Sequence, residues 1–210
     1  TFELEERPND QIELSGGWGG FFGFVGTVGL TFNNFSIKNI GNFDKWDPLP
    51  VGDGQKLSLR VQANGRSFQN YSLSLTEPWF GGKKPNALSF SFNHSVQRQV
   101  DFFNRANFGN ELGFFKITGA TLGLAKRVTW PDDYFSVSNS LQFQIYEFDQ
   151  FGTSFGLSYP TGRSNSLSIN NTIARNNVDN PIYPRFGSNI MLSTSFTPPY
   201  TSLNQNLNSE

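Results

Sequence analysis

Hydrophobic and polar residues alternate with a period of two along most of the chain. The clearest stretch runs from residue 134 to 145, where serine and glutamine side chains occupy every other position. The hydrophobic residues expected on its opposite face are Phe135, Val137, Leu141, Phe143 and Ile145. Strict alternation is typical of β-strands with one apolar face, and no segment shows a sustained helical period. The chain is therefore predicted to be all-β.

Turn-forming residues, mainly Gly, Pro, Asn and Asp, separate the alternating runs. They divide the chain into about nine strands, which we expect to be antiparallel and joined sequentially. We place these strands near residues 10–20, 24–36, 55–66, 67–79, 86–97, 113–127, 134–149, 164–178 and 187–198.

The length and chemistry of these strands favour a transmembrane β-barrel over a soluble sheet. They span about 10 to 16 residues, whereas soluble strands usually have five or six and a tilted membrane strand needs roughly 9 to 11. Their polar faces carry small uncharged side chains, not the Lys and Glu that a soluble sandwich exposes. We therefore expect the apolar face to contact lipid and the polar face to line an aqueous lumen. Further expected lipid-facing residues are Leu73, Leu75, Phe90 and Phe92.

The connections and strand ends fit the same hypothesis. Short, polar turns are expected on the periplasmic side at 80–85, 128–133 and 179–186, with 40–54 as a long exception. On the other side, 96–112 and 148–163 are longer and rich in aromatic residues, and 63–66 is a short exception. Aromatic side chains in the first of these loops, Phe102, Phe103 and Phe108, are candidates for surface contacts or for packing among the loops.

Two tryptophans lie at strand ends on the inferred periplasmic side. Trp79 and Trp130 suit an aromatic girdle at the membrane interface, although ordinary strand ends also carry aromatic residues. A sheet edge is costly in lipid, and bacterial barrels close with an even number of strands. We therefore expect further strands to follow in the parent chain, or partner strands to close the sheet.

Composition excludes several other classes of protein. The 210 residues contain 16 Lys and Arg against 17 Asp and Glu, so there is no basic excess for binding nucleic acid. The absence of cysteine rules out disulfides and cysteine-based zinc sites, and a single histidine rules out a His-rich metal cluster. The uncharged segment 14–37 is long enough for a membrane helix, but its seven glycines favour a Gly-rich hairpin.

No catalytic constellation is found in the sequence. His94 would be needed for a Ser-His-Asp arrangement, and it is better explained as a rim or lumenal residue. Asp132 and Asp133 are adjacent in a turn, where their carboxylates point in different directions. We expect no enzymatic activity, no cofactor and no metal site. The unusual element is the Gly-rich stretch 15–29, which predicts either a weakly paired strand at a barrel seam or a device for curvature.

Three motifs resemble the BamA family of outer-membrane protein assembly factors. Residues 4–8 and 12–20, Leu-Glu-Glu-Arg-Pro and Ile-Glu-Leu-Ser-Gly-Gly-Trp-Gly-Gly, resemble the junction between the last POTRA domain and the first barrel strand. Residues 70–80, which end in Glu-Pro-Trp-Phe, are similar to the fourth strand, and 179–188 to the turn between strands eight and nine. Asn180 departs from the Arg that the family often has after the Asp.

The resemblance implies a sixteen-stranded barrel, of which about the first nine strands are present. Residues 1–9 would end the last POTRA domain or its linker, and residues 10–210 would form the first part of the barrel. The protein would lie in the outer membrane of a Gram-negative cell. Its partners would be nascent outer-membrane β-barrel proteins, accessory lipoproteins of an assembly complex and the lipid bilayer, with no nucleic acid.

In this family the first strand forms a weak lateral gate whose edge pairs with client strands by β-augmentation. The positions expected to form that edge are Ile12, Glu13, Leu14, Ser15, Gly16, Gly17 and Trp18. Three alternatives stay open: a translocation or transport barrel, including one of the same superfamily, a soluble β-sandwich that binds a ligand, and an outer-membrane enzyme.

Overall fold

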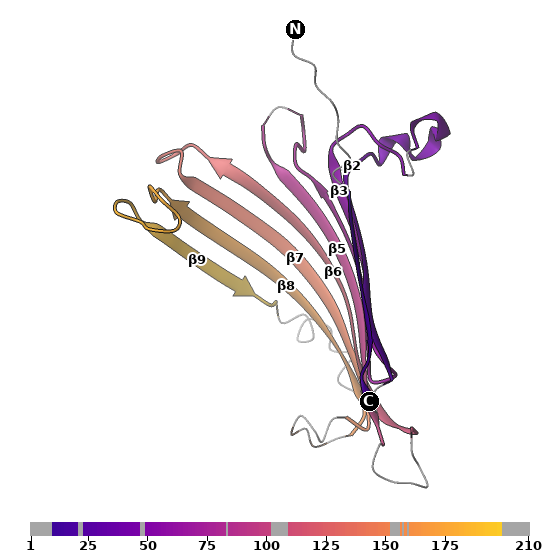
Figure 1. The fold of residues 1–210 in the computed structure, drawn as a ribbon. Coiled ribbons are helices and arrows are strands. Elements are labelled where there is room, and N and C mark those ends of the chain that lie inside the picture. Colours follow the sequence, from indigo (N-terminus) through magenta and orange to yellow (C-terminus); the bar gives the residue numbers. More distant parts are fainter. Residues whose placement is uncertain are drawn as a thin grey trace.

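Nine β-strands account for nearly all of the regular structure in the computed structural model (Figure 1). It describes residues 10–20, 23–46, 49–82, 84–101, 109–151, 156, 158 and 160–198. The strands are β1 (Gln11–Trp18), β2 (Phe24–Phe35), β3 (Gln55–Asn64), β4 (Phe68–Glu77), β5 (Ala87–Val100), β6 (Glu111–Val128), β7 (Phe135–Asp149), β8 (Gly162–Asn176) and β9 (Asn189–Phe196). Two short 3-10 helices, η2 (Lys38–Gly41) and η3 (Phe43–Lys45), lie between β2 and β3.

The strands form one antiparallel sheet in which each strand pairs with its neighbours in the sequence, from β1 to β9. Figure 1 shows the sheet as a curved, open wall with β9 at one edge. The predicted nine-stranded antiparallel order is confirmed. Strand ends differ from the prediction by a few residues, mainly because β5 and β6 continue further into their connection. The expected POTRA end at 1–9 and the loop residues Phe102, Phe103 and Phe108 lie outside the described residues.

The strand registers place the hydrophobic positions of all strands on the same side of the sheet. One row crosses eight strands through directly paired residues: Ile12, Leu30, Leu59, Leu73, Phe92, Ala120, Phe143 and Leu167. A neighbouring row crosses from β2 to β9 through Phe32, Leu57, Leu75, Phe90, Leu122, Leu141, Ile169 and Phe196. We call this side, which also carries Phe135, Val137 and Ile145, the apolar face.

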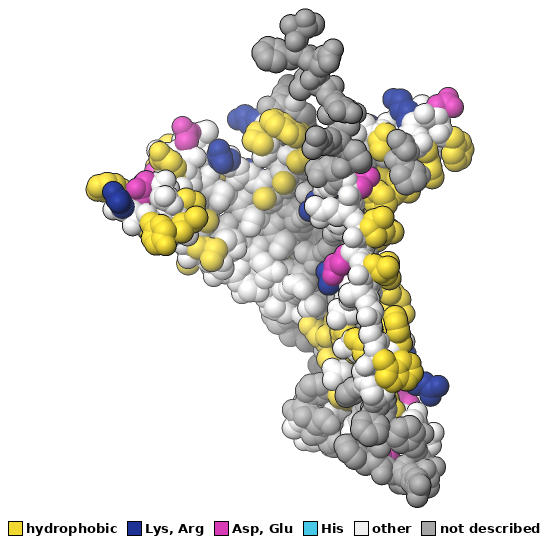
Figure 2. Space-filling view, viewed as in Figure 1, with side chains coloured by type: hydrophobic (Ala, Val, Ile, Leu, Met, Phe, Trp, Pro, Cys, Tyr) yellow, Lys and Arg dark blue, Asp and Glu magenta, His cyan; other side chains and the backbone are white. Residues whose placement is uncertain are grey.

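The opposite side is lined by small, mostly uncharged polar residues, and we call it the polar face. One of its rows consists of Gln11, Thr31, Ser58, Ser74, Ser91, Thr121, Gln142 and Ser168. In Figure 2 the hollowed side of the sheet is largely white, and hydrophobic side chains follow the outside of the edge at the right. The period of two in the sequence therefore becomes two chemically distinct surfaces of one curved layer.

No second layer covers the apolar face in the described part of the chain. Leu141 and Phe143, at its centre, keep 46% and 43% of their surface exposed. The buried hydrophobic residues among those described are Phe35, Val96, Phe148 and Phe151, which lie toward strand ends. A soluble sandwich would bury these central positions between two sheets, and this arrangement is not seen. No described helix is long and apolar enough to cross a membrane.

Both expected exceptions in loop length are seen at the ends of the sheet. The long connection 36–54 shares its end with 129–134, and the short connection 65–67 shares the other end with 150–161. His94 lies on the apolar face and not in the lumen, since it pairs with Tyr71 and Thr118 in the row that contains Ile145. Its Nδ1 lies 2.8 Å from Thr118 Oγ1, so the imidazole has a polar partner there.

A charge placed on the apolar face tests whether this face contacts hydrocarbon. Phe143→Lys in the full-length protein is expected to destabilise the barrel by roughly 2–4 kcal/mol, because a lysine near the bilayer midplane is costly. The measurement is the fraction of heat-modifiable, folded protein on cold gel electrophoresis. Gln142→Lys, one residue away on the polar face, is the matched control and should fold normally. Equal folding of the two variants would contradict the membrane assignment.

Candidate functional site

The first strand is the open edge of the sheet. All eight residues of β1 pair with β2, from Gln11 opposite Thr31 to Trp18 opposite Phe24, and none pairs with another described strand. Every β1 residue is exposed, with Ile12, Leu14 and Trp18 at 78%, 79% and 78%. An edge strand of this kind presents unpaired N–H and C=O groups that another strand can bind. The strand β9 forms the opposite edge of the described sheet in the same way.

At one position in the pairing of β1 with β2, neither strand carries a side chain. Gly16 lies directly opposite Gly26, so this position has no cross-strand side-chain pair. The ring of Phe24 covers both, because a Cβ at Gly16 would lie 3.3 Å from that ring and a Cβ at Gly26 would lie 2.8 Å from it. A Cβ at Gly26 would also come within 2.9 Å of the backbone oxygen of Ser15. The close approach explains why this pair is glycine, and it leaves this position without a cross-strand side-chain pair.

One ion pair joins β1 to β3 across the intervening strand. Arg60 donates from Nη1 and Nη2 to the two carboxylate oxygens of Glu13, at 3.1 and 3.2 Å. Between them lies Gly29, paired with Glu13 on one side and Arg60 on the other. A Cβ at Gly29 would lie 3.2 Å from Glu13 Oε2 and 3.3 Å from Glu13 Cβ, so the absence of a side chain makes room for the contact. The ion pair therefore depends on three strands.

The structure brings the predicted gate residues together on one edge but divides them between two faces. Glu13, Ser15 and Gly17 lie on the polar face, whereas Ile12, Leu14, Gly16 and Trp18 lie on the apolar face. The predicted edge residues did not include Phe24, Gly29 and Arg60, which pair with or contact β1; Phe24 and Gly29 belong to the Gly-rich stretch 15–29. The signal available for Glu13 and Arg60 was their charge at positions where the other strands carry small uncharged residues.

The acidic residues of the turns have structural partners. Asp132 Oδ2 accepts a hydrogen bond from Arg175 Nε at 2.9 Å, and its Oδ1 accepts one from the backbone of Tyr134. This agrees with the prediction that Asp132 and Asp133 form a turn. Within the described ranges, no group of three His, Asp or Glu side chains is placed to hold a metal ion.

Asp179 organises the turn between β8 and β9. Its Oδ1 accepts hydrogen bonds from the backbone N–H groups of Asn180, Arg185 and Phe186, at 2.9, 3.0 and 3.1 Å. The bonds from Phe186 and Arg185 lower the pKa of Asp179 below its ordinary value. The carboxylate therefore supports the turn above its ordinary pKa, and this support is lost as pH falls through the lowered pKa.

A single curved layer with an apolar face, a polar face and an open edge defines part of the wall of an outer-membrane-type β-barrel. Residues 51–209 match the profile of the Omp85 superfamily domain. Because this match covers most of the chain, the chain belongs to the Omp85 superfamily. The matched residues begin after β1 and β2. No curated protein sequence matches the chain.

The fold is similar to that of a solved barrel protein of the outer membrane. One similar structure is the crystal structure of BamA from Haemophilus ducreyi lacking POTRA domains 1–3, with 20% identity and a TM-score of 0.55. The similarity covers 93% of this chain and 35% of that chain. The likeness concerns the fold, and the chain spans about a third of the BamA chain that it matches.

The ion pair across Gly29 can be tested by a double-mutant cycle in the full-length protein. Glu13→Gln and Arg60→Gln should each destabilise the barrel, with a coupling energy of about 0.2–1 kcal/mol because both side chains are half exposed. Gly29→Ala should cause a similar loss that is not additive with Glu13→Gln, since both changes remove the same contact. Urea unfolding in detergent micelles measures these differences. Additive losses for Glu13→Gln and Arg60→Gln would show that the two residues are not coupled.

Proposed function

We propose that the chain is the first part of the barrel of an outer-membrane protein assembly factor of a Gram-negative cell, and that β1 is its lateral gate. The observation that supports this proposal best is the pairing of Gly16 with Gly26, which leaves β1, exposed along its whole length, without a side-chain pair at that position. A client strand would add to this edge by β-augmentation, in which main-chain hydrogen bonds supply the affinity. The client's own burial and hydrogen bonding would supply the driving force, so no enzymatic step, cofactor or metal is needed.

The missing side-chain pair between β1 and β2 suits a strand that must exchange partners. The facing glycines Gly16 and Gly26 remove a side-chain pair, and cross-strand pairs are the main source of sheet stability beyond the backbone. The ion pair of Glu13 with Arg60 holds β1 in register with β2 and β3 from the polar face. The edge would thus stay aligned while its outer side remains free to pair.

The membrane placement follows from the two faces. The apolar face would contact hydrocarbon, with Leu73, Phe92, Phe143 and their neighbours in the bilayer. Trp79 and Trp130 lie in connections at the same end of the sheet, are 55% and 81% exposed, and would form part of the periplasmic girdle. Accessory lipoproteins would dock on the periplasmic side.

A translocation or transport barrel is the second candidate. It is favoured by the polar face, whose serine, threonine, asparagine and glutamine residues would suit a water-filled passage. The two functions use different surfaces of the same wall. An assembly factor engages clients at the β1 edge, and a translocator engages them at the polar face.

Site-specific crosslinking separates the two candidates. Leu14→Cys in the full-length protein is expected to crosslink to the C-terminal strand of a nascent outer-membrane barrel protein, because residue 14 lies on the open edge. Val61→Cys is the matched control, since Val61 lies in the same row of the apolar face but its strand is paired on both sides. Crosslinks from polar-face cysteines such as Ser91→Cys to an unfolded secreted polypeptide, with none from Leu14→Cys, would support translocation instead.

The role of weak pairing can be tested at Gly17. A side chain added there meets open space, so Gly17→Val should strengthen the β1–β2 hairpin by up to about 1 kcal/mol through higher β-propensity. The variant is expected to raise the thermal midpoint of the full-length barrel and to slow the folding of client barrels in proteoliposomes. Ser168→Val, on the polar face of β8, controls for the added bulk. Unchanged client folding in a stabilised Gly17→Val barrel would contradict the gate hypothesis.

A further inference from the structure

The connection between β2 and β3 folds into a small structure of its own. It spans residues 36–54, contains η2 and η3, and is closed by β-bridges from Phe35 to Val51 and from Trp46 to Pro50. Figure 1 shows it leaning away from the sheet beside the ends of β2 and β3. We call this element the β2–β3 lobe.

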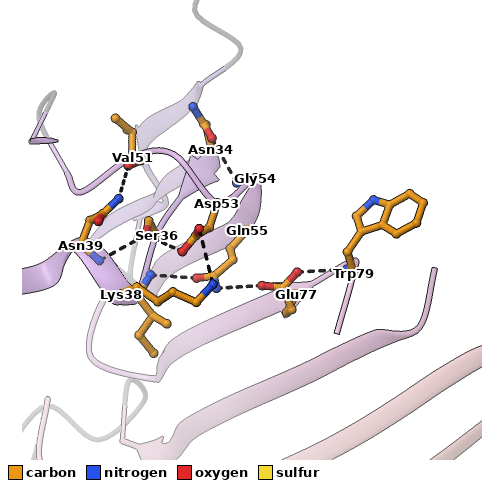
Figure 3. Close-up of polar contacts among 11 residues, drawn as sticks. Asn34, Ser36, Lys38, Asn39, Val51, Asp53, Gly54, Gln55, Glu77 and Trp79 are labelled. Atoms are coloured by element: carbon orange, nitrogen blue, oxygen red, sulfur yellow. Dashed lines mark hydrogen bonds and ion pairs between the residues drawn. The ribbon is translucent and has the colours of Figure 1, made fainter. Parts of the chain in front are cut away.

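The interior of the β2–β3 lobe contains several hydrogen-bonded polar groups. Ser36, which is fully buried, donates to Asp53 Oδ2 at 2.6 Å and accepts a hydrogen bond from the backbone of Asn39. Asn39 donates to the backbone oxygen of Val51 at 2.8 Å, and the backbone of Ile37 donates to Gln55 at 2.9 Å (Figure 3). These bonds hold the described residues of the lobe together around Ser36 and Pro50, which are both fully buried.

The large apolar side chains of the lobe point outward instead. Ile37, Ile40, Phe43 and Trp46 keep 50%, 48%, 77% and 39% of their surface exposed. Phe43 and Trp46 lie against each other with ring centroids 5.4 Å apart, so the aromatic groups form one cluster. A hydrogen-bonded scaffold that displays apolar side chains indicates a surface that another apolar phase covers.

The position of the lobe indicates which apolar phase covers its exposed side chains. Glu77, at the end of β4, accepts hydrogen bonds from Gln55 Nε2 and from the backbone of Trp79, at 2.8 and 3.0 Å. Through Glu77, the base of the lobe is therefore connected to Trp79, an exposed residue of the expected aromatic girdle. In Figure 2 the hydrophobic side chains of the lobe continue the hydrophobic band along the edge of the sheet. Lys38 and Lys45 accompany them, and mixed aromatic and lysine residues are typical of the membrane interface.

We propose that the β2–β3 lobe is a membrane-interface anchor, which inserts Ile37, Ile40, Phe43 and Trp46 into the headgroup region of the periplasmic leaflet next to the gate. This inference rests on the proposed membrane placement of the sheet. Its occupant is the phospholipid bilayer, because the apolar cluster continues a face that already meets lipid. The anchor would hold the β2–β3 hairpin end at a constant depth while β1 exchanges partners.

Depth-dependent fluorescence quenching in the full-length protein tests this placement. Phe43→Cys, in a parent otherwise free of cysteine, is labelled with an environment-sensitive fluorophore and reconstituted in phosphatidylethanolamine–phosphatidylglycerol vesicles. Asp133→Cys, in another turn at the same end, is the matched aqueous control, and Phe143→Cys is the control within the bilayer. Because Phe43 is largely exposed, its replacement leaves the hydrogen bonds of the lobe in place.

A nitroxide near the lipid headgroup is expected to quench the label at residue 43 severalfold more than the label at 133. Iodide in the aqueous phase should show the reverse order. Quenching of residue 43 by iodide to the same extent as residue 133 would overturn the proposal. Protection of residue 43 from both quenchers would also overturn it, because a protein surface would then cover the lobe. If lipid nitroxides also fail to quench the label at residue 143, the membrane placement itself is wrong. If they quench the label at residue 143 while iodide quenches the label at residue 43, only the anchor is refuted.

Discussion

The backbone hydrogen-bond ladder between neighbouring strands is the interaction on which the structure depends. The described sheet is a single layer, so side-chain packing within the chain is sparse, and each strand is held mainly by pairing with the strands beside it. Such a layer is stable only if its apolar face meets an apolar solvent and if its edges find partners. Both requirements involve groups outside the described sheet: an apolar solvent at the apolar face and further strands at the β1 and β9 edges.

Curvature explains why the polar face is built from small residues. Side chains on the hollowed side of a curved sheet converge, so bulky groups cannot be placed in every row. A Cβ at Gly119 would come within 2.8 Å of Asn93 Oδ1, and one at Gly123 within 2.7 Å of Ser89 Oγ. The glycines on β6 therefore make room for polar side chains of the neighbouring strand β5. Gly29 does the same for the contact of Glu13 with Arg60.

Strand β1 and the β2–β3 lobe both adjoin β2 and are held differently. Ser36, Asn39 and Gln55 hold the lobe by hydrogen bonds, whereas Gly16 and Gly26 leave one position between β1 and β2 without a side-chain pair. The gate proposed for β1 requires the strands behind it to keep their position. The bond from Gln55 to Glu77 extends this support from β3 to β4.

The strands, their alternation and the chemistry of both faces could be predicted from the amino-acid sequence, because a period of two is a local property of each segment. The order of the strands could also be predicted, because short turns between the strands of Leu57, Leu73 and Phe90 favour antiparallel pairing of consecutive strands. The tertiary structure decided what depends on register between strands: that Glu13 reaches Arg60 across Gly29, that Gly16 faces Gly26 beneath Phe24, and that His94 joins the apolar face. It also decided that Ser36 and Asp53 meet inside the β2–β3 lobe, because their hydrogen bond joins positions that no periodicity relates.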